Sequence, residues 1–319
     1  MHPIFFQNSK IINFEKINMF IMKKLGLLWL AVAMMTLFVS CDKDDLGVFN
    51  PKLKIARVYS EVDMHYLQEQ WSWSTDYLEK IDYYKKNGNV DYTQTYHYDK
   101  NRLTSIEMDK MHTNFVYDGK TLTNIYTYYG DQLMESYALS YDKKKLSHLS
   151  VQKSLDKSFA RPASDFLACL FPMEDPAPAA CLYSNDDSKG TYDYSAAEID
   201  FIWEADNIKY MKMTINRPEG TQKLTYTYLY DNNINPKKNF FTLYVDNGML
   251  DQYPQSPFCS SNNVTSVYVT DETDFQTRTH SYSYSYNYYK KYPTKMHLLK
   301  YNDMSQTTDS LLLYTFQYQ

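Results

Sequence analysis

Short runs in which apolar or aromatic residues alternate with polar ones recur along most of the chain. In 92–98 the tyrosines Tyr92, Tyr96 and Tyr98 share one side of the run, and polar turn residues follow from Lys100 to Arg102. A period of two is typical of β-strands with one buried face, and polar turns between such runs are typical of hairpins. The pattern therefore predicts an all-β protein made of antiparallel hairpins.

A longer motif repeats on top of this alternation. An aromatic residue ends a strand, Leu or Ile follows five positions later, and another apolar residue follows three positions after that. The first four copies start 25, 19 and 24 residues apart, which is the size of one hairpin. The copies are Trp73, Leu78, Ile81; Tyr98, Leu103, Ile106; Tyr117, Leu122, Ile125; Tyr141, Leu146, Leu149; Trp203, Ile208, Met211; and a weaker Tyr288, Pro293, Met296.

The spacing inside the motif leaves one local question open. Leu103 and Ile106 are three residues apart, so a regular strand would place them on opposite faces. Either a β-bulge intervenes or both faces meet apolar groups. For the whole domain, residues 52–319, we expect an antiparallel meander of long hairpins curled into a half-barrel or superroll, with a closed β-barrel as the alternative. Residues 155–195 interrupt the pattern and predict a loop insertion with one short helix, which caps an end or edge of the sheet.

The start of the chain has a different composition. Lys23 and Lys24 precede an uncharged stretch, 25–39, which is short for a membrane span and suits a signal peptide. With Cys41 directly after it, the segment resembles the bacterial lipoprotein signal, in which the cysteine receives acyl chains. The alternative is an ordinary membrane anchor helix. We expect residues 1–21 to be a mis-assigned upstream start, 22–40 the signal peptide, and 41–51 the lipidated cysteine and an acidic tether.

The residues after Cys41 bear on location. Lys43, Asp44 and Asp45 resemble the acidic tag that sends lipoproteins of Bacteroidota-type bacteria to the outer face of the outer membrane. The resemblance implies a lipid-anchored, surface-exposed protein whose partner is the membrane, through acyl chains on Cys41.

The hairpin units also resemble a known class of repeats. Residues 96–104, with Tyr98-Asp99, are similar to the YD repeats of RHS-type proteins. They are more similar to a family of uncharacterised Bacteroidota lipoproteins, a resemblance that 228–236, 262–265 and 284–294 also carry. The resemblance covers most of 52–319 and implies no activity.

Composition narrows the function classes. The chain has a net charge of −5, and removing the leader with its four lysines and one glutamate makes it −8, which argues against nucleic acid as a partner. Tyr is abundant at 33 residues and Gly is scarce at 8, so the turns must use Asp, Asn and Lys. Cys169 and Cys181 are close enough in sequence for a disulfide, which an exported protein can form.

Catalytic motifs are absent from the sequence. It contains no nucleophile elbow, no His-Glu-x-x-His and no phosphate loop, and its histidines are dispersed singly. We therefore expect no enzyme activity, no metal and no cofactor.

The aromatic residues are the remaining candidates for ligand contact, because Tyr and Trp rings stack on sugars. The candidate ligand-facing residues are Trp71, Trp73, Trp203, Tyr282, Tyr284 and Tyr286. Each could equally be part of a cross-strand ladder that holds the sheet together. We expect a surface binding or adhesion module, with glycan as one candidate ligand. A structural or assembly role beside another envelope protein is the alternative, and an enzyme comes third.

Overall fold

A computed structural model describes residues 46–61, 64–153, 196–217, 220–241, 259–272, 278–302 and 307–319. Asp44–Gln319 forms one compact unit. The candidate residues Cys41, Lys43, Asp44, Asp45, Cys169 and Cys181 lie outside the described residues, as does the expected insertion at 155–195. The predictions that concern them, lipidation, export tag, disulfide and short helix, therefore stay predictions.

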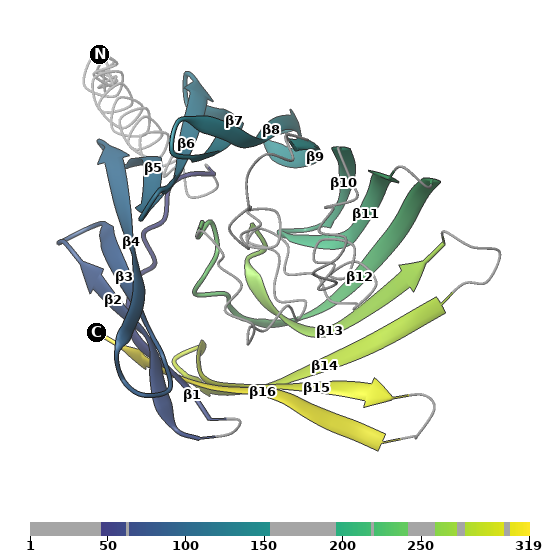
Figure 1. The fold of residues 1–319 in the computed structure, drawn as a ribbon. Helices are drawn as coiled ribbons and strands as arrows, with labels where there is room; N and C mark the ends of the chain where they lie inside the picture. Colours follow the sequence, from purple (N-terminus) through teal and green to yellow (C-terminus); the bar gives the residue numbers. More distant parts are fainter. Residues whose placement is uncertain are drawn as a thin grey trace, which may run out of the picture. The chain divides into compact units, whose positions relative to one another are not determined.

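In the described residues, sixteen antiparallel strands form one sheet that closes on itself, because β1 pairs with β16 (Figure 1). The all-β meander is confirmed, the closed barrel that was the alternative is correct, and the open half-barrel is wrong. The strands are β1 Ile55–Ser60, β2 Tyr66–Trp73, β3 Leu78–Tyr84, β4 Val90–Asp99, β5 Arg102–Met108, β6 Met111–Asp118, β7 Thr121–Tyr129, β8 Gln132–Asp142, β9 Lys145–Lys153, β10 Ala196–Glu204, β11 Asn207–Arg217, β12 Gly220–Ile234, β13 Asn262–Asp271, β14 Arg278–Tyr289, β15 Tyr292–Asn302 and β16 Thr307–Tyr318.

The barrel wall has an apolar inner face and a polar outer face. Along β10, Ala197, Ile199 and Phe201 are buried in the single core cluster, whereas Glu198 and Asp200 point outward. The same alternation runs through the neighbouring strands. A barrel that faces lipid carries an apolar band on its outside. On the described strands the outer face is mostly polar instead, with single exposed apolar side chains such as Val116, Ile202 and Leu229.

In every copy of the motif a β-bulge separates the two apolar residues. Tyr98 pairs with Leu103 and His97 pairs with Ser105, so Thr104 is the extra residue and both Leu103 and Ile106 face the core. The register shifts in the same way beside Trp73, Tyr117, Tyr141, Trp203, Tyr230 and Tyr288. Of the two readings of the three-residue spacing, the bulge is correct.

The bulge residue has a role of its own where it carries a hydroxyl. Thr104 Oγ1 donates to the carbonyl oxygen of His97 at 3.0 Å. Thr123, Ser147 and Thr294 donate in the same way to the carbonyl seven residues earlier, at 3.2, 3.2 and 3.1 Å. A bulge interrupts the ladder of backbone hydrogen bonds, and the hydroxyl satisfies a carbonyl at that interruption.

In most of the hairpins an aromatic residue ties that hairpin to the one before it. Tyr141 OH, for example, donates to the carbonyl of Leu122, which is the first apolar residue after the turn of the preceding hairpin. We call these residues the aromatic collar. Its bonds are Trp73 to Ile55 at 2.7 Å, Tyr117 to Leu103 at 2.8 Å, Tyr141 to Leu122 at 2.6 Å, Trp203 to Leu146 at 2.7 Å, Tyr230 to Ile208 at 2.6 Å, Tyr286 to Val264 at 2.8 Å and Tyr318 to Pro293 at 2.6 Å.

We expect Tyr141→Phe to lower the free energy of unfolding by about 1–3 kcal/mol, because it leaves the carbonyl of Leu122 without its donor. Urea denaturation followed by tryptophan fluorescence measures the change. Tyr289→Phe is the matched control, since Tyr289 is 58% exposed and lies outside the collar. Equal losses in both variants would show that the collar bond does not stabilise the barrel.

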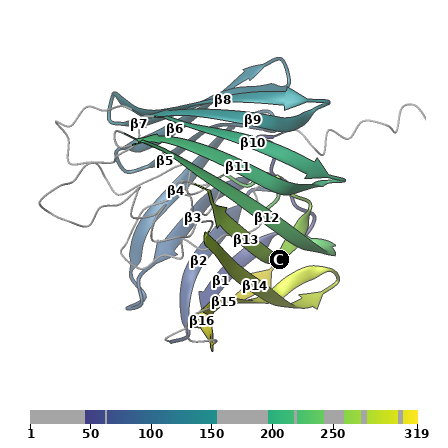
Figure 2. The ribbon, with the colours of Figure 1, turned by 90° about the vertical axis from the view of Figure 1, so that its right-hand side faces the viewer.

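The collar marks one end of the barrel, which we call the turn end. It carries the hairpin turns of the repeats, including 143–144 and 290–291, as well as the carboxyl terminus on the right of Figure 2. Two chain segments close across it: 46–50 and 235–241. The ring centroid of Phe240 lies 4.7 Å from that of Trp71 and 5.2 Å from that of Phe49. The segment that follows β12 therefore packs against β2. We call these two segments the plug.

Part of the expected acidic tether therefore contacts the barrel. Leu46 and Phe49 are buried, and the carbonyl of Gly47 accepts a hydrogen bond from the Leu103 amide at 2.9 Å. Gly47 has a φ of +90°, and a Cβ there would lie 2.0 Å from the Tyr117 hydroxyl. Only glycine suits this position, so the chain enters the barrel beside the collar.

Candidate functional site

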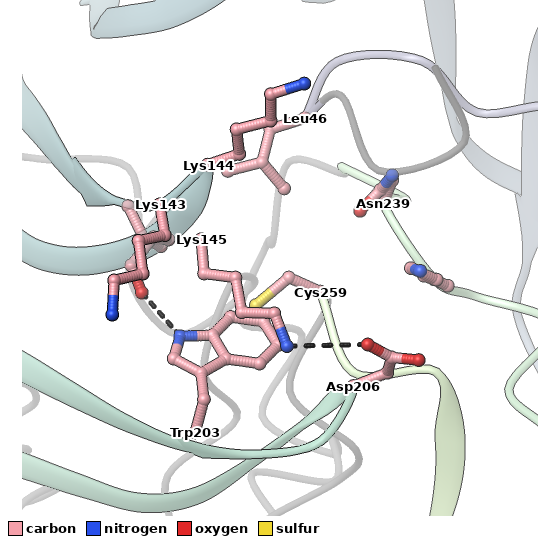
Figure 3. Close-up of a pocket in the computed structure, with 10 residues that line it drawn as sticks. Leu46, Lys143, Lys144, Lys145, Trp203, Asp206, Asn239 and Cys259 are labelled. Carbon is pink, nitrogen blue, oxygen red and sulfur yellow. Dashed lines mark hydrogen bonds and ion pairs between the residues drawn. The ribbon is translucent and has the colours of Figure 1, made fainter. Parts of the chain in front are cut away.

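A small pocket opens at the turn end, between the β8–β9 turn and the plug (Figure 3). Its volume is about 170 Å³, which is enough for a small anion and several waters but not for a large ligand. The lining residues are Leu46, Lys143, Lys144, Lys145, Leu146, Trp203, Asp206, Lys238, Asn239 and Cys259.

Positive charge dominates this pocket. Four of its residues are lysines and one is an aspartate, in a chain whose net charge is −5. Lys145 and Asp206 pair with each other at 3.4 Å, and both side chains are well exposed. Lys143 and Lys144 make no ion pair with any described residue, so they leave uncompensated positive charge at the mouth.

The backbone holds these two lysines in an unusual conformation. Lys143 and Lys144 both have positive φ, 48° and 71°, as a two-residue hairpin turn of type I′ requires. Asn and Gly adopt such angles at little cost, whereas other residues are strained there by about 1–2 kcal/mol each. The same conformation recurs at Lys290 and Lys291. The expectation that the turns use Asp, Asn and Lys agrees with the positive φ of these lysines, of Asp109 and of Asn239.

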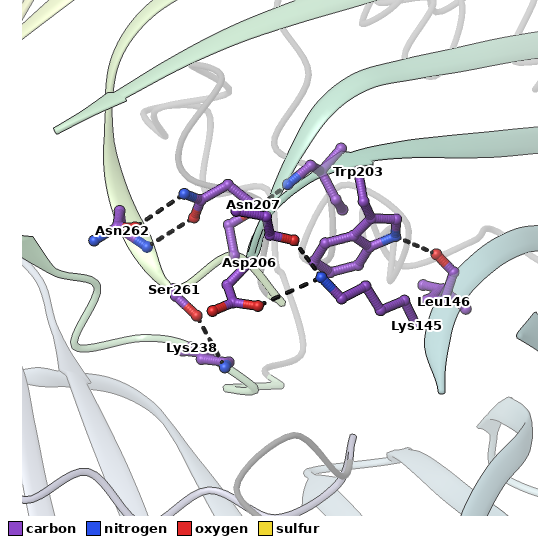
Figure 4. Close-up of polar contacts among 11 residues, drawn as sticks. Lys145, Leu146, Trp203, Asp206, Asn207, Lys238, Ser261 and Asn262 are labelled. Atoms are coloured by element: carbon purple, nitrogen blue, oxygen red, sulfur yellow. Dashed lines mark hydrogen bonds and ion pairs between the residues drawn. The ribbon is translucent and has the colours of Figure 1, made fainter. Parts of the chain in front are cut away.

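Trp203 forms a wall of the pocket. Its indole nitrogen donates to the carbonyl of Leu146 at 2.7 Å, and Lys145 Nζ lies 5.0 Å from the ring centroid (Figure 4). Lys145 also donates to the carbonyl of Ala205. Because the ring is already covered by a cation and its nitrogen is engaged, Trp203 positions Lys145 and is poorly placed to stack on a neutral sugar.

Side-chain amides fix the opposite side of the pocket. Asn207 and Asn262 exchange hydrogen bonds of 2.9 and 3.0 Å, and the Ser261 amide donates to the carbonyl of Asp206 at 3.1 Å. Lys238 Nζ donates to Ser261 Oγ at 3.0 Å. The β10–β11 turn, the start of β13 and the plug are thereby connected, as Figure 4 shows.

Cys259 lies at the base of the pocket as a free thiol. Burial raises its pKa to about 12, so it stays protonated and unreactive at neutral pH.

The other predicted ligand-facing aromatics lie elsewhere. Trp71, Tyr282 and Tyr284 are buried in the core of the barrel, and Trp73 and Tyr286 are half-buried members of the collar. Only Trp203 of the six borders the pocket. The lysines were missed as site residues, although the run Lys143-Lys144-Lys145 in a turn without glycine was a visible signal.

A second polar cluster lies on the outer face between β9 and β10. His148 contacts Asp200 at 2.8 Å through Nδ1 and Glu198 at 2.9 Å through Nε2, and Ser150 donates to Glu198 at 3.0 Å. The hydrogen bond that His148 donates to Asp200, and then that to Glu198, raise the pKa of His148 above its usual value, against the opposing effect of burial. Across the described ranges, no three His, Cys, Asp or Glu side chains are placed to hold a metal ion.

His148 should make stability depend on pH. Because the pKa of His148 is raised in the folded state, its stabilising contribution is complete below about pH 6.5, the unfolded pKa, and is lost as the pH rises through the folded pKa. We expect His148→Gln to destabilise the barrel at pH 5.5 and to have little effect at pH 8.5, as measured by urea denaturation. A proton NMR titration in which Glu198→Gln with Asp200→Asn leaves the imidazole pKa unchanged would contradict this assignment.

Comparisons with known proteins give no family. No family model and no curated protein matches the chain. Among solved structures, it is similar to a porin-like protein from Bacteroides vulgatus ATCC 8482, with a TM-score of 0.46 and 8% identity over 84% of this chain and 99% of that one. It is similar as well to a porin-like protein from Bacteroides uniformis ATCC 8492, with a TM-score of 0.47 and 10% identity over 86% of this chain and 100% of that one.

In the part of the chain that the structure describes, we find no helix with the length and apolar character needed to cross a membrane.

Proposed function

We propose that this protein is a lipid-anchored binding module of the outer membrane, held by acyl chains on Cys41 and exposed at the cell surface. The basic-then-apolar segment before Cys41 and the acidic residues after it support the anchor. The polar outer face of the barrel supports attachment through lipid rather than through the strands.

The pocket at the turn end is the proposed binding site, and its ligand is a small anionic group such as a phosphate, a sulfate or the carboxylate of an acidic sugar. The observation that carries this proposal is the excess of lysine over carboxylate around the pocket in an acidic protein. Lysine is a point charge with three donors, and it binds tetrahedral anions well. A neutral glycan is disfavoured because Lys145 covers the Trp203 ring.

The left-handed turn allows a sharp test. Lys143→Asn with Lys144→Gly should stabilise the turn by about 1–2 kcal/mol in total, because it relieves the strain at both positions while the glycine adds an entropic cost on folding. The same change removes two charges from the pocket, and we expect it to weaken binding of inorganic phosphate or sulfate at least tenfold in isothermal titration calorimetry. Stability and binding then move in opposite directions, which a merely unfolded variant cannot do.

Lys290→Asn with Lys291→Gly is the matched control. It makes the same chemical change in a turn of the same conformation, outside the pocket lining. We expect this variant to keep the affinity for phosphate. Absence of anion binding by the unchanged protein, or equal losses of affinity in the two variants, would overturn the proposal that this pocket binds anions. Metabolic labelling with palmitate tests the anchor separately, since Cys41→Ala should abolish the label.

A further inference from the structure

Basic side chains gather at the turn end well beyond the pocket. They are Lys52, Lys54, Lys100, Arg102, Lys120, Lys143, Lys144, Lys145, Lys237, Lys238, Lys290 and Lys291. Fewer carboxylates lie at this end. They are Glu69, which pairs with Lys237, and Asp76, Asp99, Asp118, Asp142, Glu204, Asp206 and Asp231.

The described turns at the other end have a different balance. There Lys85, Lys86 and Lys110 are matched by Glu61, Asp91, Asp109 and Asp131. Over the described residues the barrel is therefore electrically asymmetric, with its positive end at the collar although the whole chain is acidic.

The described chain begins at the same end, a few residues after Cys41 in the sequence. Leu46 is buried at the turn end and lines the pocket. Five residue steps separate it from Cys41, and even fully extended they span at most about 18 Å. A lipidated Cys41 would thus hold the turn end within that distance of the membrane, which leaves little room for the barrel to turn its other end toward the lipid.

The surface of this end suits a membrane interface. Tyr289 is 58% exposed, and Lys290 Nζ lies 5.2 Å from its ring centroid at the tip of the β14–β15 turn. Exposed aromatic rings beside lysines are typical of protein surfaces at the level of lipid headgroups. The two Lys-Lys pairs occupy left-handed turn positions at this end, whereas the described two-residue turns at the other end are Asp109-Lys110 and Gly130-Asp131. Strained backbone conformations cluster at functional sites, so the strain at these lysines points to a function for their positive charge.

We propose that the turn end rests on the membrane that carries the anchor, that its lysines bind anionic lipid headgroups, and that a headgroup phosphate occupies the Trp203 pocket. The inference rests on the proposed function, because it takes the anchor at Cys41 and names the source of the anion in the pocket. The opposite end of the barrel then faces away from the membrane.

Sedimentation with vesicles tests the surface without help from the acyl chains. The chain from Asp42 onward contains the whole compact unit and lacks Cys41. We expect it to bind vesicles of phosphatidylcholine with about 30% of the anionic lipid phosphatidylglycerol and not vesicles of phosphatidylcholine alone, because lysines are attracted to anionic surfaces. Lys144→Glu with Lys290→Glu should weaken binding by about tenfold or more, because each lysine near an anionic surface contributes substantially.

Lys85→Glu with Lys110→Glu is the matched control at the other end, with the same change in net charge. Retained vesicle binding in this control and loss in the turn-end variant would support the inference. No binding by the unchanged chain, or equal losses in both variants, would overturn it. Phosphate binding in solution without vesicle binding would sink this inference while leaving the proposed pocket intact, so the two failures are distinguishable.

Discussion

Deletion of Tyr314–Gln319 should abolish cooperative unfolding of this protein. These residues supply all the partners of β1 in the closing pair, from Ile55 opposite Tyr318 to Ser60 opposite Tyr314. The deletion also removes the buried rings of Tyr314 and Phe316, each worth about 3–5 kcal/mol by comparison with truncation to alanine. The sum approaches the total stability of an ordinary domain, about 5–15 kcal/mol.

Opening of the barrel should also promote association between chains. With β16 shortened, β1 becomes an edge whose backbone groups are unpaired, and such edges associate with other chains. We expect the truncated protein to show a broad, non-cooperative urea transition and early elution from a sizing column. Deletion of Gln319 alone is the control, since it removes one backbone hydrogen bond to Lys54 and leaves the strand pairing complete. A truncated chain with an unchanged midpoint would show that closure contributes little.

Closure was encoded in the sequence in a form that is easy to overlook. Ile55 and Val58 are three residues apart and both are buried, like Leu103 and Ile106, but no aromatic strand precedes them within the described residues. Tyr318 ends the last strand without a return strand after it, and it pairs with Ile55. The two chain ends are therefore the halves of one more repeat. The alternating pattern predicts hairpins but does not fix their curvature, so only the pairing of these half-repeats distinguishes a barrel from a half-barrel.

The candidate site was less predictable for a physical reason. Lys143 to Lys145 form a local run that the sequence displays, but Asp206 and Lys238 reach the pocket only because the closed barrel brings the β10–β11 turn and the plug beside the β8–β9 turn. The hydrophobic periodicity of the sequence does not reveal contacts between turns that are far apart in the chain. Trp203 was a candidate because Trp rings stack on sugars, yet its hydrogen bond to Leu146 and its contact with Lys145 make it part of the collar.

The plug explains why the second large effect should come from Phe240, a residue in no strand. Its ring lies 4.7 Å from that of Trp71, 5.2 Å from that of Phe49 and 6.2 Å from that of Tyr96, and it is 7% exposed. We expect Phe240→Ala to lower the free energy of unfolding by about 3–5 kcal/mol, the usual cost of a cavity left by a buried aromatic ring. Urea denaturation measures the loss.

The same variant should also loosen the chain before β1, because Phe49 packs against the ring that is removed. Limited proteolysis should then cut between Leu46 and Lys54 at protease levels that leave the unchanged protein intact. Leu229→Ala is the matched control: Leu229 lies on β12 but is 45% exposed on the outer face, so its loss should cost about 0.5 kcal/mol or less. If Phe240→Ala destabilised the barrel without exposing this segment, the anchor-proximal chain would be held by its Gly47 contacts alone, and the plug would not act as one unit.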